Sequence, residues 1–479
     1  MNDIKEIEEL IDIGQIDRAR IILDDVVKAN IPRQHLTRWA RVFRRIDDPE
    51  SAAAILSPAV RSGSRFVDSA NTDELAEYAG TIARLGSVEE ASDLLDNVGV
   101  EEATPNLSFN RMSVAMRKWD YNLALPHVES YLKDNNLSPF GRELGEVNLL
   151  SCCLATGDYQ RAEDILKGLE SKTDPNRVES RGRLYYLDLQ LRYLTKRPYI
   201  DSSLPIASMT PQTQLLIRKW SLIHKHQEMN NKSQAEIEFE KLKEDAIKIG
   251  NWELVRDSDF FMSLLCGRED LARKVYFGTP FDSYVQRIEP YLSKDVLVED
   301  QYIWSENADS SQIFDLKEQI EKSGRGLESQ QIKLINTLCM DFYRPQFYGS
   351  IFSYTNPDEL FDISTTPTRI RKTVQRSNEW LKNVAPGIQI EVFGKHNYRI
   401  KMESQWGISL PRVREKRSTK GTLSRILEKN ANGEFSISDA VEILGLSKKI
   451  VRSVIDRDLS IGQLEKFGEG KNTKYAYKS

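Results

Sequence analysis

The chain has 479 residues, of which 40% are hydrophobic and 29% are charged. At roughly 100 to 200 residues per domain, this length predicts about three folding units, and the composition excludes collagen-like, low-complexity and disordered proteins. No apolar run approaches the roughly 18 residues of a membrane helix. The first residues, MNDIKEIEEL, are acidic, so we expect neither a membrane span nor a secretory signal. The four cysteines form no C-x-x-C pair, which predicts reduced thiols and a cytoplasmic location.

The formal net charge of -5 is unevenly distributed along the chain. Residues 361–479 carry 23 basic and 13 acidic side chains, a balance of +10, whereas residues 1–360 carry 44 basic and 59 acidic ones, a balance of -15. A basic part attached to an acidic body is typical of a nucleic-acid-binding module joined to an interaction or sensor module. A basic solvated surface has the same composition, so charge alone leaves both interpretations open.

A repeated pattern occupies the first half of the chain. Segments such as GQIDRARIIL, GSVEEASDLL and GDYQRAEDIL begin with a turn residue, place an alanine five positions later and an aliphatic residue four beyond it. The first five alanines are 33, 39, 33 and 38 residues apart, and two later ones are 37 apart. A period in this range predicts stacked pairs of antiparallel helices. The alanines are Ala19, Ala52, Ala91, Ala124, Ala162, Ala235 and Ala272.

This pattern resembles the second helix of tetratricopeptide (TPR) repeats, in which a small residue lies between neighbouring helices. The resemblance covers residues 1–280, but the Trp and Leu-Gly signature of the first TPR helix is missing. It implies a TPR-like α-solenoid that binds a protein or a peptide along its concave face. A second copy of the chain, in a homodimer, also remains open as its partner.

Residues 295–403 show a different pattern. Two strand-like segments, VEDQYIWSEN and SSQIFDLKEQ, precede a helix that begins near Glu328. A short helix at NPDELFDI follows, and then a longer helix at TPTRIRKTVQRSNEWLKN with Thr366 as its cap and Pro367 at its first position. The segment IQIEVFGKHNYRIKM predicts a β-hairpin that turns near Gly394. Strands, three helices and a hairpin are the order of a winged helix.

The segments IFDLKEQIEKSGRGLESQQIKLINTL, DELF, RIRKTVQRSNEWL and EVFGKHNYRIK resemble the OmpR-like DNA-binding domain of bacterial response regulators. Val392, Gly394, Tyr398 and Arg399 match the wing of that family with one extra residue, whereas the long FYRPQFYGSIFSYT stretch departs from its pattern. The resemblance implies a third helix in the major groove and a hairpin against the DNA backbone.

In the longer helix, Ile370, Val374, Ser377 and Leu381 share one face, which we expect to be buried. The resemblance assigns DNA contacts to the opposite face and to the wing, because arginine and lysine side chains reach base edges and phosphates. The predicted contacts are Thr368, Arg369, Lys372, Thr373 and Arg376 in the helix, and Lys395, His396 and Arg399 in the wing.

A second unit of the same order occupies residues 420–479. TLSRILEKN, SISDAVEILGL and SKKIVRSVIDRDLSIGQ predict three helices, the third capped by Ser447, and LEKFGEGKNTKYAYK predicts a hairpin that turns through Gly468 and Gly470. These segments resemble the general bacterial winged helix-turn-helix. Residues 404–419 predict a basic linker that either follows phosphates or is only a solvated tether. The predicted DNA contacts here are Lys448, Lys449, Arg452, Lys471 and Lys474, and in the linker Arg412, Arg414, Lys416 and Arg417.

Motifs for catalysis, cofactors and metals are missing from the sequence. GEGKNT lacks the spacing of a phosphate-binding loop, and His224 and His226 are two residues apart, so one helix face cannot hold both. We therefore expect no enzymatic activity, no cofactor and no metal. The predicted fold class is mostly α, with a TPR-like α-solenoid followed by two α+β winged-helix domains.

Two functions fit these patterns. One is a sequence-specific transcription regulator, in which the solenoid senses a signal or forms oligomers and the winged helices bind double-stranded DNA. The other is a non-enzymatic scaffold or adaptor, because helical repeats followed by a winged helix also resemble PCI-type subunits of large complexes. The lysines and arginines of both third helices favour the regulator. RNA binding by the basic half would instead require exposed aromatic side chains on the strands.

Overall fold

The computed structural model describes residues 4–12, 15–26, 31–61, 70–98, 104–229, 231–299, 301–305, 310–322, 327–411, 421–431, 433–470 and 473–478. Most of these residues are helical, and the β-sheets of the described residues are small and lie in the C-terminal part. The predicted mostly α class is therefore confirmed. Within these ranges, no helix is long and apolar enough to cross a membrane.

Helices α1 to α17 follow one another along residues 4–298 and pack mainly against their neighbours in sequence. This helical region continues past residue 280, the predicted end of the repeats, through the two short helices α16 and α17. The bounds are α1 (Ile4–Asp12), α2 (Ile16–Val26), α3 (Leu36–Arg45), α4 (Pro49–Val60), α5 (Thr72–Arg84), α6 (Val88–Asp96), α7 (Pro105–Arg117), α8 (Tyr121–Leu132), α9 (Pro139–Thr156), α10 (Tyr159–Lys172), α11 (Val178–Leu194), α12 (Pro211–Met229), α13 (Lys232–Lys248), α14 (Trp252–Cys266), α15 (Glu269–Phe277), α16 (Asp282–Ile288) and α17 (Lys294–Val298).

The alanines of the repeated pattern are all buried, with exposed fractions between 0% and 4%. Four of them follow a turn residue with a positive φ: Asp47 (63°), Gly86 (92°), Trp119 (58°) and Gly157 (85°). Glycine adopts this backbone region freely, whereas Asp47 and Trp119 occupy it at a conformational cost. The turn geometry of the repeat is therefore kept even where glycine is absent.

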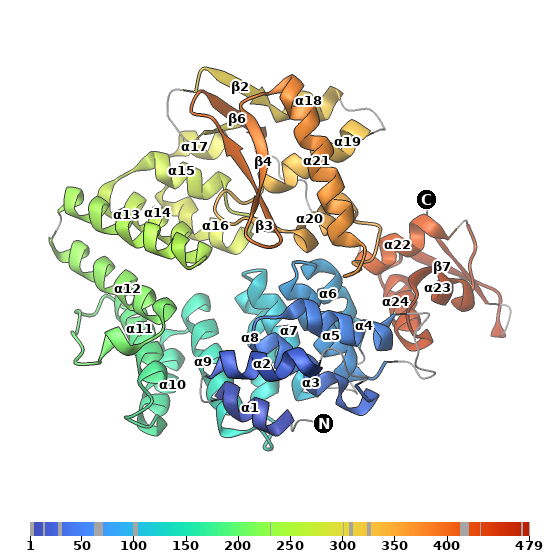
Figure 1. The fold of residues 1–479 in the computed structure, drawn as a ribbon, viewed down its shortest axis with the longest axis horizontal. Helices are drawn as coiled ribbons and strands as arrows, with labels where there is room; N and C mark the ends of the chain where they lie inside the picture. The colour runs from blue at the N-terminus through green and yellow to red at the C-terminus, as the bar shows by residue number, and fades with distance from the viewer. Residues whose placement is uncertain are drawn as a thin grey trace.

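Contacts of the Trp119 indole explain why a large side chain stands at such a turn. Its ring lies 4.7 Å from that of Tyr284 and 6.2 Å from that of Phe281, measured between ring centroids. Both partners belong to the segment around α16, far along the chain. The helical region is therefore curved, and its middle contacts its end (Figure 1).

Residues 301–411 form a unit of two small sheets and four helices, which we call the first unit. Strand β6 lies between β1, to which it is antiparallel, and β2, to which it is parallel. Strand β5 lies between β3 and β4 and is antiparallel to both. The bounds are β1 (Gln301–Ser305), β2 (Gln312–Asp315), α18 (Leu316–Lys322), α19 (Leu327–Leu338), β3 (Gln346–Phe347), α20 (Tyr348–Thr355), α21 (Thr366–Val384), β4 (Ile388–Phe393), β5 (Asn397–Met402) and β6 (Trp406–Pro411).

The helix predicted at NPDELFDI is wrong. Residues 356–363 form turns, and the helix lies instead in the preceding FYRPQFYGSIFSYT stretch, as α20. Pro357 disfavours a helical conformation of the residue before it, and Asn356 ends α20 with φ -129° and ψ 59°. The cap of α21 is also shifted by one residue, from Thr366 to Thr365.

Part of the predicted linker is also wrong, because residues 406–411 form strand β6. Its alternate side chains Trp406, Ile408 and Leu410 are 9%, 0% and 7% exposed. Such burial requires strands β1 and β2, which lie about a hundred residues earlier in the sequence. Local patterns therefore could not separate this strand from the basic residues that follow it.

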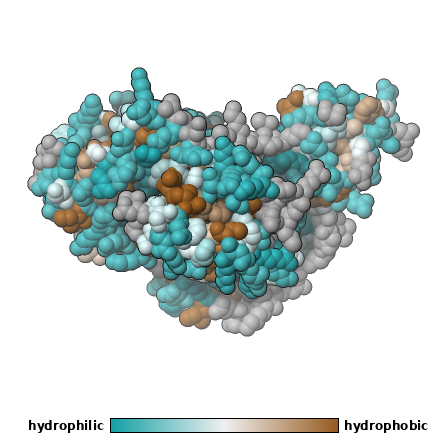
Figure 2. All heavy atoms as spheres, turned by 90° about the horizontal axis from the view of Figure 1, so that it is seen from above, coloured by the Kyte–Doolittle hydropathy of each residue, from teal (hydrophilic) through white to brown (hydrophobic). Residues whose placement is uncertain are grey.

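Residues 421–478 form the second unit, which consists of α22 (Thr422–Asn430), α23 (Ile437–Leu444), α24 (Lys448–Ser460) and the hairpin of β7 (Leu464–Phe467) and β8 (Lys474–Tyr477). The predicted helices and hairpin are present. Ser447 caps α24 by accepting the N–H of Ile450, and Gly468 and Gly470 have φ values of 70° and 61°. This unit stands out from the rest of the molecule at one side (Figures 1 and 2).

The first unit contacts the helical region near its beginning. Helix α20 lies so close to the end of α5 that a Cβ atom on Gly349 would be 1.9 Å from the carbonyl oxygen of Leu85. Beside this contact, the N–H of Phe361 donates a hydrogen bond of 2.8 Å to Oε2 of Glu90 in α6. An apolar core runs without interruption from helices α1 to α7 into this unit.

The first unit also contacts the end of the helical region. Arg256 of α14 is fully buried and forms an ion pair of 2.7 Å with Asp341, in the loop after α19. The hydroxyl of Tyr343 donates to Asp259 over 2.9 Å. Burial opposes ionisation of Asp259, but Lys274 and Lys243 outweigh it and lower the pKa of this carboxyl. The first unit therefore joins the two ends of the curved helical region (Figure 1).

The second unit is attached around one carboxylate of α6. Oδ2 of Asp93 accepts the N–H of Leu423, and Oδ1 lies 2.6 Å from Nη1 of Arg457. A further ion pair of 3.0 Å joins Lys429 to Asp358 of the first unit. The two units are thus close in space, and both contact helix α6.

Candidate nucleic-acid interface

Helix α21 has the amphipathic arrangement that its sequence predicts. Ile370, Val374, Ser377 and Leu381 are buried, as expected, and the opposite side faces solvent. Lys372, Arg376 and Thr368 are exposed on that side. In the part of the chain that the structure describes, neither the Lys372 ammonium nor the Arg376 guanidinium has a hydrogen bond or an ion pair. These two cations are available to an external phosphate or base.

Arg369 and Thr373, on the same helix, already have partners. The guanidinium of Arg369 donates to both carboxylate oxygens of Glu359, at 2.5 and 3.0 Å, and lies 5.1 Å from the ring centre of Phe352. These hydrogen bonds raise the pKa of Arg369 and lower the pKa of Glu359. The hydroxyl of Thr373 donates to the carbonyl of Arg369. Arg369 could contact a DNA base only if its guanidinium first gave up the hydrogen bonds to Glu359.

The tip of the first unit's hairpin contacts the helical region. Lys395 Nζ lies 3.3 Å from one carboxylate oxygen of Glu50 in α4, and Nε2 of His396 lies 3.1 Å from the other. The hydroxyl of Tyr348 donates to the same carboxylate. In this arrangement the predicted wing residues Lys395 and His396 are directed at an acid of the same chain.

The strands of this hairpin also have partners within the chain. Arg399 forms an ion pair of 2.5 Å with Glu391 across β4 and β5, and its guanidinium lies 4.5 Å from the ring centre of Phe393. The Phe393 ring in turn meets Trp252 of α14 at 5.4 Å. The hairpin therefore lies between the beginning and the end of the helical region, where it packs against both.

Helix α24 of the second unit exposes its predicted cations. Ile450, Val451, Val454 and Ile455 are buried on one side, and the opposite side bears exposed cationic side chains. Those of Lys448 and Arg452 have no hydrogen bond or ion pair within the described ranges. The exposed members of this face are Lys448, Lys449 and Arg452.

The remaining predicted DNA contacts are either in a weak surface ion pair or outside the described residues. Lys474 lies 3.5 Å from Glu434, and both side chains are about half exposed, so this pair is easily opened. Arg412, Arg414, Lys416 and Arg417 of the linker, and Lys471 of the second hairpin, lie outside the described residues.

One exposed cation of α21 is missing from the prediction. Arg371 lies beside Lys372 on the exposed surface and is close enough to Tyr398 to act on the pKa of that phenol. The helical spacing of Arg371 relative to the buried Ile370 could have identified it. The acidic partners Glu50 and Glu359 could not be found in this way, because no local motif relates them to the cations they bind.

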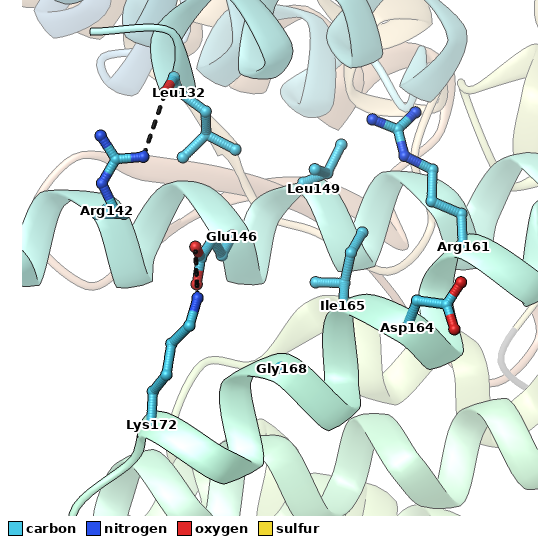
Figure 3. A pocket seen from close by; sticks show the side chains of 9 residues that line it. All are labelled: Leu132, Arg142, Glu146, Leu149, Arg161, Asp164, Ile165, Gly168 and Lys172. Atoms are coloured by element: carbon cyan, nitrogen blue, oxygen red, sulfur yellow. Dashed lines mark hydrogen bonds and ion pairs between the residues drawn. The ribbon is translucent and has the colours of Figure 1, made fainter. Parts of the chain in front are cut away.

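A separate pocket of about 360 Å³ lies between α8, α9 and α10 (Figure 3). Its cations are already bound. Lys172 pairs with Glu146 at 3.3 Å, Arg161 pairs with Glu129 at 2.7 Å, and Arg142 donates to the carbonyl oxygen of Leu132. With no unpaired group directed into it, this pocket offers little to a charged ligand.

Groups suited to metal binding or thiol chemistry do not come together either. Across the described ranges, no three His, Cys, Asp or Glu side chains are placed as a metal site requires. The four cysteines are buried free thiols, and burial raises the pKa of Cys152 to about 12. That thiol stays protonated and unreactive at neutral pH.

The chain matches no protein-family model, no curated protein and no solved structure.

Proposed function

We propose that the chain is a sequence-specific DNA-binding transcription regulator. In this proposal the helical region is a TPR-like solenoid that senses a protein or peptide or forms oligomers, and both C-terminal units are winged helices. The observation that carries the proposal is the exposed face of α24, where Lys448 and Arg452 have no acidic partner among the described residues. In a winged helix the third helix enters the major groove, and α24 is the third helix of a unit that stands out from the molecule (Figure 1).

Helix α21 supplies a second surface for DNA. Lys372 and Arg376 are exposed and unpaired within the described chain, whereas Arg369 is bound to Glu359. We therefore place the principal contacts of the first unit at Lys372 and Arg376. Contacts by Lys395 and His396 stay predictions that require the hairpin tip to leave Glu50.

The experiment incubates the purified full chain with fragments of the genome that encodes it, at about 150 mM salt, and sequences the fragments that the chain retains. This salt concentration is chosen because non-specific DNA binding weakens steeply as salt rises. A few enriched fragments with a common motif are expected. Replacing Arg452 by alanine should weaken binding to such a fragment by about 1 to 3 kcal/mol if it contacts a base.

The matched control is Arg197→Ala, which removes the same charge from an exposed arginine of the helical region. Its affinity should equal that of the parent. If Arg452→Ala and the double variant Lys372→Ala/Arg376→Ala both bind as the parent does, the assigned surfaces are wrong. If the parent enriches nothing, DNA binding itself is wrong.

A scaffold or adaptor is the second candidate. It is favoured by the β4–β5 hairpin, which packs between α4 and α14 instead of projecting from the molecule. A scaffold that uses its winged helices for packing would retain no DNA fragment at about 150 mM salt.

A further inference from the structure

One glycine of the helical region is not explained by its backbone or by its neighbours. Gly168 lies inside helix α10, where glycine destabilises a helix relative to alanine because its backbone has more freedom to lose. Its φ is not positive, and a Cβ atom added to it would meet no other atom within 4 Å. Neither a turn nor a close approach therefore requires glycine at this position.

The other glycines inside the described helices each lie against a neighbouring group. A Cβ atom on any of them would come within 3.0 Å of another residue, so a side chain has no room there. The distances are 1.9 Å at Gly80, 2.9 Å at Gly141, 2.7 Å at Gly145, 2.4 Å at Gly182 and 1.9 Å at Gly349. Gly168 is the exception in this part of the chain, because the space beside it is open.

This open space belongs to the pocket of about 360 Å³ between α8, α9 and α10, which Gly168 lines (Figure 3). Each of the three helices also contributes an aliphatic side chain to the pocket, Leu132, Leu149 or Ile165. Leu149 belongs to the apolar core of these helices, and Leu132 and Ile165 pack against that core. The pocket therefore has an aliphatic floor, and the missing side chain of Gly168 leaves room beside it.

Two cations at the rim of the pocket are neutralised by carboxylates of the same chain. Lys172 lies 3.3 Å from Glu146, and Arg161 lies 2.7 Å from Glu129. These side chains are partly exposed, and their ion pairs can stay closed while the floor is covered. The anchor of a ligand is therefore apolar.

Two other rim charges have only neutral partners. The Arg142 guanidinium donates to the carbonyl oxygens of Leu132 and Asp134, at 3.3 and 2.8 Å. The Asp164 carboxylate accepts from the side-chain amide of Gln160, at 3.4 Å. Within the described ranges neither Arg142 nor Asp164 forms an ion pair. Figure 3 shows them at opposite ends of the pocket, so the aliphatic floor lies between a positive and a negative charge.

We propose that this pocket binds an aliphatic side chain of a partner's peptide segment, with an acidic residue of the segment at Arg142 and a basic one at Asp164. Burial of aliphatic atoms supplies the affinity, and the two end charges fix the orientation of the segment. A pocket of this size and lining is typical of a binding site. The inference rests on the proposed function, in which the helical region binds a protein or peptide, and it specifies the chemistry of that partner.

The test selects phage-displayed random peptides on the immobilised full chain. Selected peptides are then synthesised, and their affinities are measured by fluorescence anisotropy. They should share an aliphatic residue flanked by an acidic residue on one side and a basic residue on the other. A selection that yields no common sequence, or one without the aliphatic residue, would overturn the proposal.

Gly168→Leu assigns these peptides to the pocket. The new side chain fills the space and should weaken their binding more than about tenfold. The thermal unfolding midpoint should not fall, because the Cβ position is open and leucine favours a helix. Lys167→Leu adds the same side chain at the neighbouring exposed position, outside the pocket lining, and should bind as the parent does. Unchanged affinity in Gly168→Leu would remove the assignment.

Asp164→Asn tests the charge at one end of the pocket. It should weaken binding of the same peptides by about threefold at low salt, and by less at high salt, because salt screens exposed charges. Equal affinity of parent and variant at low salt would contradict the basic residue assigned to this end.

Two further measurements distinguish this proposal from its alternatives. Gly168→Leu should retain DNA fragments as the parent does, so a failure of peptide binding and a failure of DNA binding are separate results. Mass spectrometry of the extract from denatured purified chain detects a small apolar molecule that copurifies. If such a molecule accompanies the parent but not Gly168→Leu, the ligand is that molecule and the peptide proposal is wrong.

Discussion

The two C-terminal units both contain helices and a β-hairpin, but they are attached to the helical region in different ways. The first unit touches both ends of that region, through Gly349 against α5 and through Asp341 against Arg256. The second unit contacts the helical region at α6, where Asp93 binds Leu423 and Arg457, and its apolar side chains continue the same core.

This difference also decides which cations are available. The hairpin of the first unit contacts Glu50 and Trp252, so its cations are bound within the chain. The second unit touches the body through Arg457 and the start of α22, which leaves Lys448 and Arg452 on the other side of α24 exposed. A helical unit with a hairpin can thus serve internal packing in one place and leave the cations of a helix exposed in another.

The largest expected effect is at the attachment of the first unit to α14. Arg256→Met removes the partner of Asp341, which is 4% exposed, and leaves that carboxylate buried without its cation. Breaking such a pair costs about 3 to 5 kcal/mol of unfolding free energy, measurable by urea denaturation.

The control is Arg268→Met, which opens a solvent-exposed ion pair with Asp270 and should cost about 0 to 1 kcal/mol. Equal losses in the two variants would show that the α14 attachment contributes no more than a surface contact.

The second effect concerns the close packing of α20 on α5. Gly349→Leu places side-chain atoms where the Leu85 carbonyl oxygen lies 1.9 Å from the Cβ position, and overpacking of this kind costs about 1 to 3 kcal/mol or more. The thermal unfolding midpoint should fall accordingly.

Gly168→Ala is the matched control, because no atom lies within 4 Å of its Cβ position in helix α10. Alanine in a helix interior should stabilise by roughly 0.5 to 1 kcal/mol. A midpoint that rises in both variants would contradict the close approach of α20 and α5.

The smallest effect is expected at the second unit. Asp93→Asn keeps the side-chain shape but removes the charge that holds Arg457 and the N–H of Leu423. The free energy of local opening at the start of α22 should fall by about 1 kcal/mol. Faster hydrogen exchange of the Leu423 amide would measure this decrease.

Glu163→Gln, which removes a carboxylate of α10 paired with Arg197, should leave this exchange unchanged. If Asp93→Asn also leaves Leu423 as protected as in the parent, the second unit is held by its apolar contacts, and its attachment resembles that of the first unit after all.

Local patterns in the sequence determined most of the helices and both predicted hairpins, including the one that turns at Gly394. The repeated alanines fill buried positions, Ser447 caps α24, and the buried face of α21 follows its helical spacing. Each of these features depends on residues a few positions apart, where periodicity and capping act directly. The helix predicted at NPDELFDI is absent, and the preceding aromatic stretch FYRPQFYGSIFSYT contains helix α20 instead.

Only the tertiary structure decided which of the predicted cations meet an acid. Lys395 binds Glu50, 345 residues away in the sequence, while Arg376 and Arg452 on similar helices stay exposed. Strand β6 likewise depends on β1, with Trp304 opposite Ile408. These distant residues come together because the helical region is curved and the first unit contacts it at two separate places. No short-range sequence pattern encodes that curved arrangement. The sequence determined where the cations stand along their helices, and the closed arrangement decided which of them remain available.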